Sequence, residues 1–151
     1  MNKILLIITG SIAASRCKEI ITLLNNKEVN ISCILTKEAK KYVKKSDIKK
    51  SLKNRIFTDE DEKKNKMLHI NLSRDNDIIV MCPATANSIA KFANGYGDNL
   101  ASNTLLASNK KILFVPAMNS FMWHNKINQK NVKLLKDSGH EFIGPKVGNL
   151  K

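Results

Sequence analysis

The sequence has no apolar run long enough to cross a lipid bilayer. Its first run, residues 4–8, falls far short of the roughly 20 residues that a membrane-spanning helix needs. That run is followed by Gly10 and lacks a small-residue cleavage site, so we do not interpret it as a signal peptide. We therefore expect a cytoplasmic protein with no membrane partner.

Cysteine is also scarce, with only Cys17, Cys33 and Cys82 in the chain. They are an odd number, widely spaced, and form no CxxC pair, so we expect no metal site. Cys33 and Cys82 stand inside apolar runs, where a free thiol packs as a small apolar side chain. We interpret these residues as buried, reduced thiols rather than reactive groups.

Acidic residues are few: 13 against 26 basic residues, which gives a net charge of +13. Much of the excess lies between Lys37 and Arg55, where lysines alternate with apolar residues at helical spacing. No aromatic residues are interleaved there to stack against bases, so we do not expect a nucleic-acid partner. The positive charge would instead help to attract an anionic, phosphorylated small molecule.

Apolar runs alternate with helical patterns along the whole chain. Strands are predicted at residues 3–9, 30–36, 77–82, 111–115 and 141–143. Helices are predicted at residues 12–25, 37–52 with a break near Ser46 and Asp47, 86–93, 98–108 and 125–138. The polar stretch 58–66 is predicted to be a loop, and Pro83 and Pro116 are predicted to end strands. This alternation predicts one α/β domain over residues 1–151, an open parallel sheet flanked by helices.

In such sheets the ligand lies beyond the carboxyl ends of the strands. Gly10 and Ser11 form the first strand-to-helix turn, where free N–H groups and a hydroxyl favour an anion such as phosphate. No second glycine follows in the next turn, so the segment is neither a dinucleotide fingerprint nor a P-loop. A Gly-Ser turn made only for packing remains an equal alternative.

Two further segments follow predicted strands. Residues 83–88 are small and polar, which suits either a flat ring lying against the backbone or a helix start capped by Thr85. Residues 116–123 include Asn119, whose amide both donates and accepts hydrogen bonds. Packing is the alternative role for Met118 and Met122, and it is the interpretation that we favour for Trp123.

His69 is the candidate for proton exchange near neutral pH. A lone histidine more often has a structural role, so the residue type alone does not decide between the two. His124 and His140 have weaker settings, each beside a polar helix or turn.

Together these segments resemble the homo-oligomeric flavin-containing cysteine decarboxylases. The matching stretches, in the family's order and spacing, are TGSIAA at 9–14, LHINL at 68–72, PATANSIAKFANGYGDNL at 83–100 and PAMNSFMW at 116–123. PAMNSFMW with an upstream His-Ile pair is highly specific. TDEDE at 58–62 also looks like the plant decarboxylase version of that loop.

The resemblance implies a flavodoxin-like (Rossmann-like) fold that binds oxidised FMN. It implies a catalytic role for His69, a grip on the substrate carboxylate by Asn119, and a substrate contact by Met122. It also places the flavin at a subunit interface, and thus implies a homotrimer or a homododecamer built of trimers. The residues implied to hold FMN are Gly10, Ser11, Ile12, Thr36, Thr85, Ala86, Asn87, Ser88 and Ala117.

The implied reaction is FMN-dependent decarboxylation of a phosphorylated cysteine amide, 4'-phosphopantothenoylcysteine, to 4'-phosphopantetheine in coenzyme A biosynthesis. The family's late Ala-Cys-Gly segment has no counterpart before residues 148–151, so we expect the domain to lack its C-terminal substrate flap. A peptidyl-cysteine decarboxylase that releases an enethiol therefore remains an alternative.

Two other relatives fit the residues less well. His69 and Asn119 argue against a non-catalytic flavin-binding regulator. A flavin prenyltransferase shares the general fold but is not expected to carry PAMNSFMW.

Overall fold

The computed structural model describes residues 1–146, which form one six-stranded sheet in the order β3-β2-β1-β4-β5-β6. Every neighbouring pair runs parallel, as predicted, and β1 pairs with β2 from Asn2 opposite Val29 to Ile8 opposite Leu35. The strands are β1 Asn2–Ile8, β2 Val29–Leu35, β3 Ile56–Phe57, β4 Ile78–Ala84, β5 Ile112–Pro116 and β6 Glu141–Phe142. The strand order reverses between β1 and β4, which is where doubly wound sheets bind ligands.

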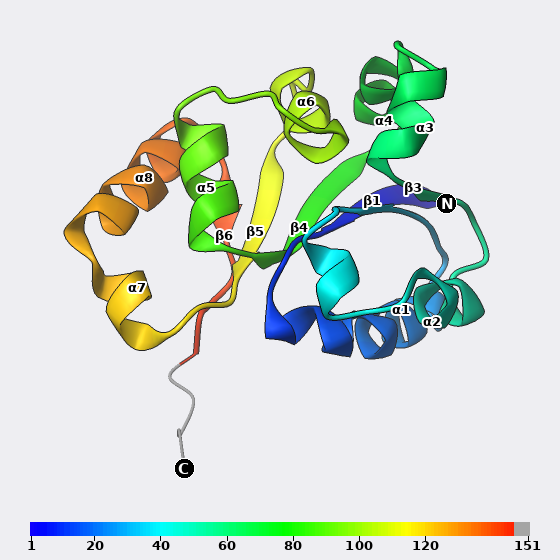
Figure 1. The fold of residues 1–151 in the computed structure, drawn as a ribbon, viewed down its shortest axis with the longest axis horizontal. Coiled ribbons are helices and arrows are strands. Elements are labelled where there is room, and N and C mark those ends of the chain that lie inside the picture. The colour runs from blue at the N-terminus through cyan, green and yellow to red at the C-terminus, as the bar shows by residue number, and fades with distance from the viewer. Residues whose placement is uncertain (147–151) are drawn as a thin grey trace.

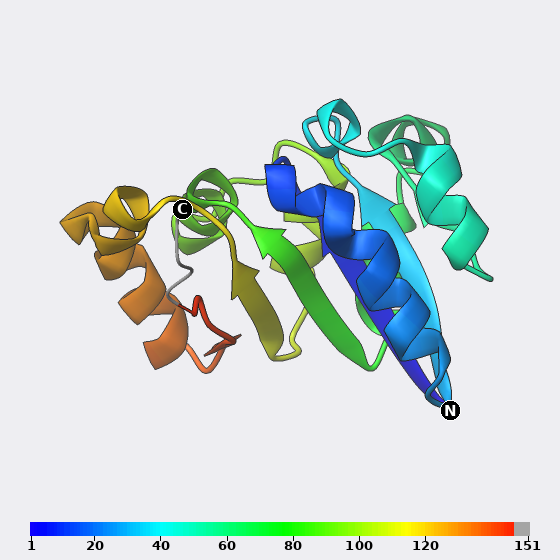
Figure 2. The same cartoon turned by 90° about the horizontal axis from the view of Figure 1, so that it is seen from below.

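Helices cover both faces of this sheet. Figure 1 shows α1 and α2 on one side and α4 and α6 on the other, and Figure 2 shows α1 crossing its face of the sheet. The helices are η1 Ile12–Arg16, α1 Cys17–Asn25, η2 Ala39–Lys41, α2 Lys45–Ser51, α3 Asp59–Lys64, α4 Leu68–Asp75, α5 Ala86–Ala93, α6 Leu100–Leu106, α7 Ser120–His124 and α8 Lys126–Asp137.

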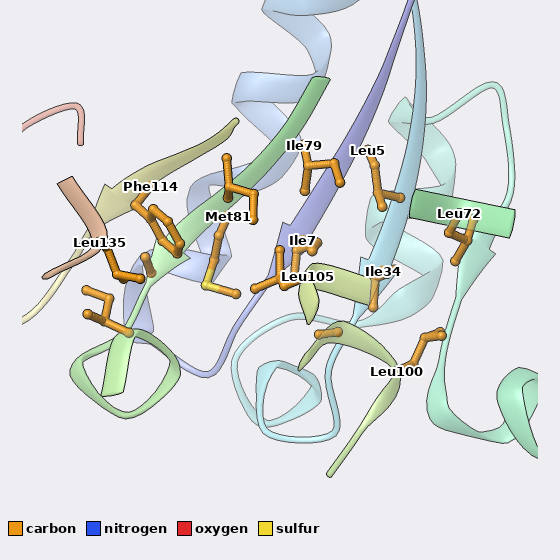
Figure 3. Packing of buried hydrophobic residues seen from close by; sticks show 14 of the residues in the cluster. Leu5, Ile7, Ile34, Leu72, Ile79, Met81, Leu100, Leu105, Phe114 and Leu135 are labelled. Carbon is orange, nitrogen blue, oxygen red and sulfur yellow. The ribbon is translucent and has the colours of Figure 1, made fainter. Parts of the chain in front are cut away.

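The continuous apolar run of β1 is explained by burial on both faces. Leu5 and Ile7 point into the cluster beneath α4, α5, α6 and α8, whereas Ile4, Leu6 and Ile8 point into the cluster beneath α1 and α2. Figure 3 shows the first of these clusters, in which strand residues meet Leu100, Leu105 and Leu135 from the helices.

The predicted loop at 58–66 is wrong, because the segment contains helix α3. Thr58 precedes the helix, and its backbone N–H donates to the Asp61 carboxylate at 2.8 Å, as in a capping box. Acidic residues fill the first turn and Lys63 and Lys64 the last, which complements the helix dipole. The helix has no apolar face for a periodicity argument to detect.

Smaller departures concern boundaries. The break in the 37–52 segment falls before α2, so Ser46 and Asp47 lie in the first turn of that helix. Pro83 and Pro116 lie within the carboxyl ends of β4 and β5 instead of beyond them. A register irregularity between Met81 and Ala84 accommodates the missing N–H of Pro83. Strand β3 and helices α4 and α7 were not predicted.

All three cysteines are free and buried, as predicted. The Cys17 thiol donates to the Cys82 carbonyl at 3.3 Å, and burial raises the pKa of the Cys33 thiol. Over residues 1–146 no helix is long and apolar enough to cross a membrane, and no cluster of metal-ligating side chains is found. Residues 148–151, where the flap was expected to be missing, lie outside the described part of the chain.

His140 has a structural setting that leads to a pH prediction. Its Nδ1 accepts from the Ile112 N–H at 3.2 Å beside the Phe92 ring, and burial lowers the pKa of His140 below its ordinary 6.5. As pH falls, the His140 imidazole is therefore protonated in the unfolded chain at a higher pH than in the folded chain. The free energy of unfolding should then fall as pH drops below about 6.5.

Denaturant unfolding of the wild type and of His140→Asn from pH 7.5 to 5 would test this. Asparagine can still accept from Ile112 but does not titrate, so the variant should lose part of that slope. Identical slopes in the two proteins would contradict the prediction.

Candidate functional site

A cavity of about 640 Å³ opens at the carboxyl ends of β1, β2, β4 and β5. It is lined by the turns that follow these strands, together with one side of α6. The predicted site residues that line it are Gly10, Ser11, Thr36, Thr85, Ala86, Asn87, Ser88, Ala117 and Met122. Ile12, His69 and Asn119 are not among the lining residues.

The first turn requires a glycine because of a close approach between two segments. A Cβ atom on Gly10 would lie 2.5 Å from the Glu38 Cβ and 3.1 Å from the Glu38 carbonyl carbon. Ser11 caps η1 by accepting from the Ala13 N–H at 3.2 Å. The turn after β1 therefore packs directly against the segment after β2, and both face the cavity.

The turn after β4 caps a helix, as one of the two interpretations predicted, and it also lines the cavity. Thr85 caps α5 by accepting from the Ser88 N–H at 3.1 Å, and both residues also line the cavity. The buried Thr9 hydroxyl donates to the Pro83 carbonyl at 2.5 Å and so ties this turn to the end of β1. The N-terminal turn of α5 therefore faces the cavity from a fixed position.

Charged side chains around the cavity largely offset one another. Lys91 contacts Asp98 at 2.7 Å and Lys41 contacts Glu38 at 2.5 Å, and in each pair the hydrogen bond to the lysine lowers the pKa of the carboxyl group. A bound anion would therefore depend on backbone N–H groups, hydroxyls and Lys37, which also lines the cavity.

Asn119 lies at the start of α7, where its side chain accepts from the Met122 N–H at 2.8 Å. Met118 and Trp123 pack against the core cluster, which confirms the packing interpretation for Trp123. Met122 is 45% exposed and lines the cavity, and Phe121 is 90% exposed. Asn119 itself is exposed and lies in sequence between Met118 and Met122, which line the cavity.

His69 lies on α4, away from Asn119. Figure 1 shows α4 and α7 at opposite ends of the molecule. The His69 Nδ1 atom lies 2.9 Å from a Glu62 carboxylate oxygen on α3, and Glu62 also lines a second hollow of about 440 Å³ beside the main cavity. The structure therefore does not bring His69 and Asn119 together within one chain.

Sequence reasoning missed Glu62 as a neighbour of His69, and it missed Asn103 of α6, which donates to Glu62 at 3.2 Å. The TDEDE stretch and the Thr58–Asp61 spacing were the only signals, because they mark a helix start that would bring acidic residues close together. The contacts of α3 with α4 and α6 follow from the tertiary fold.

Comparison with known proteins places the whole chain in one group. The pattern of the flavoprotein family matches residues 1–150. A probable phosphopantothenoylcysteine decarboxylase of Streptococcus mutans is 32% identical over 149 residues, which are 96% of this chain and 83% of that protein. The coenzyme A biosynthesis bifunctional protein CoaBC of Bacillus subtilis is 31% identical, over 99% of this chain but only 37% of its own length.

Solved structures agree with this grouping. A phosphopantothenoylcysteine (PPC) decarboxylase mutant, C175S, complexed with pantothenoylaminoethenethiol, superimposes with a TM-score of 0.87 at 29% identity, over 96% of this chain and 82% of that one. The FMN-binding protein AtHal3 superimposes with a TM-score of 0.89 at 29% identity, over 99% and 83%.

Proposed function

This chain belongs to the flavoprotein family, and from that premise we propose that it decarboxylates 4'-phosphopantothenoylcysteine to 4'-phosphopantetheine with FMN as cofactor. The observation that carries the proposal is the convergence of three matching segments, 9–14, 83–88 and 116–123, at the carboxyl edge of the sheet, where each contributes residues to the cavity. Relatives named for this reaction match nearly the whole chain.

The cavity suits a flavin mononucleotide by size and by chemistry. Its volume of about 640 Å³ lies within the usual range for cofactor sites. The small side chains of Ala86 and Ala117 leave room for a flat ring near the backbone, and Gly10 lets the first turn pack against Glu38. The capped starts of η1 and α5 offer hydroxyls and N–H groups to a phosphate.

FMN, when bound, would accept two electrons from the cysteine thiol and so create the electron sink that loss of carbon dioxide requires. The residues of this chain then have distinct roles. The Asn119 amide NH₂ would donate to the substrate carboxylate and orient it, and Met122 would contact the substrate. His69 would hold or move the proton near the reacting carbon and sulfur atoms.

Since His69 and Asn119 lie at opposite ends of one chain, we propose that two copies complete each site. Exposed apolar side chains support an interface: Ile12 is 79% exposed, Phe121 90% and Ile127 74%. We propose a trimer, or a dodecamer built of trimers, that acts in the cytoplasm. In it, α4 of one copy would lie beside α7 of the next. Light scattering coupled to size-exclusion chromatography should give the trimer mass or a multiple of it, and a monomer would contradict this arrangement.

Gly10→Ala should weaken FMN binding by roughly tenfold to a hundredfold. The added methyl group meets backbone and Cβ atoms of Glu38, so the turn must shift, at about 1–3 kcal/mol for such overpacking. Titration of the apoprotein with FMN, followed by flavin fluorescence, measures the change. Gly139→Ala is the control, because no atom lies within 4 Å of a Cβ there, although its positive φ will lower stability.

To test the function itself, the purified protein and FMN are mixed with 4'-phosphopantothenoylcysteine, and the mass of the product is measured by mass spectrometry. Loss of carbon dioxide alone gives the saturated thiol and supports the proposal. Loss of carbon dioxide plus two hydrogens gives the enethiol, which means that the reaction stops before reduction. An unchanged substrate beside bound flavin, with turnover of a peptide ending in cysteine, would overturn the substrate assignment in favour of the peptidyl-cysteine alternative.

A further inference from the structure

We propose that Glu62, held in place by Asn103, is a positioning residue that fixes the tautomer of His69. This inference rests on the proposed function, because it assigns a task to the histidine that we place in the mechanism. It states that Nδ1 of His69 carries the proton and faces Glu62. Nε2 then keeps its lone pair for the reacting groups.

The surroundings of the ring carry the argument. The Nδ1 atom is buried and lies 2.9 Å from Glu62 Oε1, without an aligned hydrogen bond, and residues 1–146 offer it no hydrogen-bond partner. The two side chains are only 27% and 19% exposed, so water screens the contact weakly. A buried ring nitrogen beside a carboxylate is stable as a donor, whereas a bare lone pair there would face negative charge.

The carboxylate itself is held by a third helix. The Asn103 Nδ2 atom lies 3.2 Å and 3.4 Å from the two oxygens of Glu62 and donates to them. The backbone N–H of Leu100 donates to the Asp59 side chain at 2.9 Å and ties α6 to α3 a second time. Glu62 is thus held by Asn103 of α6 while one of its oxygens lies beside His69.

A glycine keeps Asn103 in this position. A Cβ atom on Gly97 would lie 2.5 Å from the Asn103 Oδ1 atom and 3.1 Å from a Leu106 methyl carbon. Any larger residue at position 97 would push the amide away or force it to turn. Successive contacts therefore link Gly97 to Asn103, Asn103 to Glu62, and Glu62 to His69. Together they connect α6, α3 and α4.

A neutral imidazole has two ring nitrogens, of which one carries a proton and the other a free lone pair. When one ring nitrogen donates to a carboxylate, the tautomer and the ring orientation are both set. For histidines that bind a metal, loss of such a supporting partner costs about tenfold to a hundredfold in activity, and we expect an effect of this order here. The loss should appear in kcat more than in KM, because Glu62 supports the histidine and has no assigned contact with the substrate.

Glu62→Gln tests the proposal, with Glu60→Gln as the matched control. Both change one carboxylate to an amide on α3, but Glu60 is exposed and pairs with Lys40 instead of His69. In the FMN-loaded protein we expect Glu62→Gln to lower kcat about tenfold to a hundredfold with little change in KM. We expect Glu60→Gln to match the wild type.

The decisive readout is the ¹⁵N NMR spectrum of the His69 ring in the FMN-loaded protein, which needs no turnover. Wild type and Glu60→Gln should show the Nδ1–H tautomer. Glu62→Gln should shift the ring toward Nε2–H, because the new amide can donate to Nδ1. An Nε2–H ring in the wild type, or no shift in Glu62→Gln, would overturn the positioning role.

Two further outcomes distinguish a failure of the positioning role from a failure of the proposed function. If no substrate turns over while the tautomer still responds to Glu62→Gln, the proposed function fails and the positioning role stands. If Glu62→Gln does not fold, Asn103→Ala takes its place, and it should give a smaller shift toward Nε2–H. An unchanged tautomer in Asn103→Ala would then count against the proposal.

Discussion

We expect His69→Asn to abolish decarboxylation while FMN stays bound. Asparagine fills much of the space of the ring and can form hydrogen bonds, but it does not exchange a proton near neutral pH. Loss of a general acid or base lowers rates by about 10²–10⁴-fold. Flavin should be retained because His69 does not line the cavity of its own chain. Carbon dioxide release and the absorption spectrum of the bound flavin measure the two effects.

His140→Asn is the matched control for that experiment. It makes the same substitution at a histidine that packs against Phe92 and accepts from the Ile112 N–H. Turnover should persist in this variant at a temperature where it remains folded. Turnover at the wild-type rate in His69→Asn would remove His69 from the mechanism.

Asn119→Asp should leave the fold intact and remove activity. Aspartate caps helices as well as asparagine does, so the bond from the Met122 N–H to this side chain persists. The variant loses the NH₂ donor and places a negative charge where we expect the substrate carboxylate. A lost hydrogen bond to a charged group costs about 1.5–3 kcal/mol, and repulsion adds to it, so kcat/KM should fall at least about a hundredfold.

Asn125→Asp separates this effect from helix capping. Asn125 caps α8 by accepting from the Ile127 N–H at 2.9 Å, so the same chemical change occurs at the next helix start along the chain. Both variants should keep the melting temperature of the wild type, and only Asn119→Asp should lose activity. Equal activity in the two variants would contradict the carboxylate grip.

The fold could be predicted where burial leaves a clear pattern in the sequence. Residues 4–8 of β1 are all apolar because both faces of the strand are covered there, and α5 was predicted with the bounds Ala86–Ala93. Helix α3 was missed because it is polar all round and is held by its cap and by contacts to α6. Strand β3, with two residues, and α7, with five, are too short to show a period.

The cavity could be predicted for a topological reason. Parallel strands end at the same edge, so the turns carrying Gly10, Thr85 and Ala117 had to meet there. The separation of His69 from Asn119 could not be predicted, because strand order alone does not say where α4 comes to lie. The contacts of Glu62 with His69 and Asn103 join three helices, and their distances depend on how those helices pack.

The two outermost strands have a consequence for how copies of the chain can associate. Both β3 and β6 are only two residues long, so each outer edge of the sheet offers few unpaired backbone groups. Short edges resist the strand-by-strand stacking that leads to aggregates. Growth into fibres by extension of the sheet is therefore disfavoured at both of its edges.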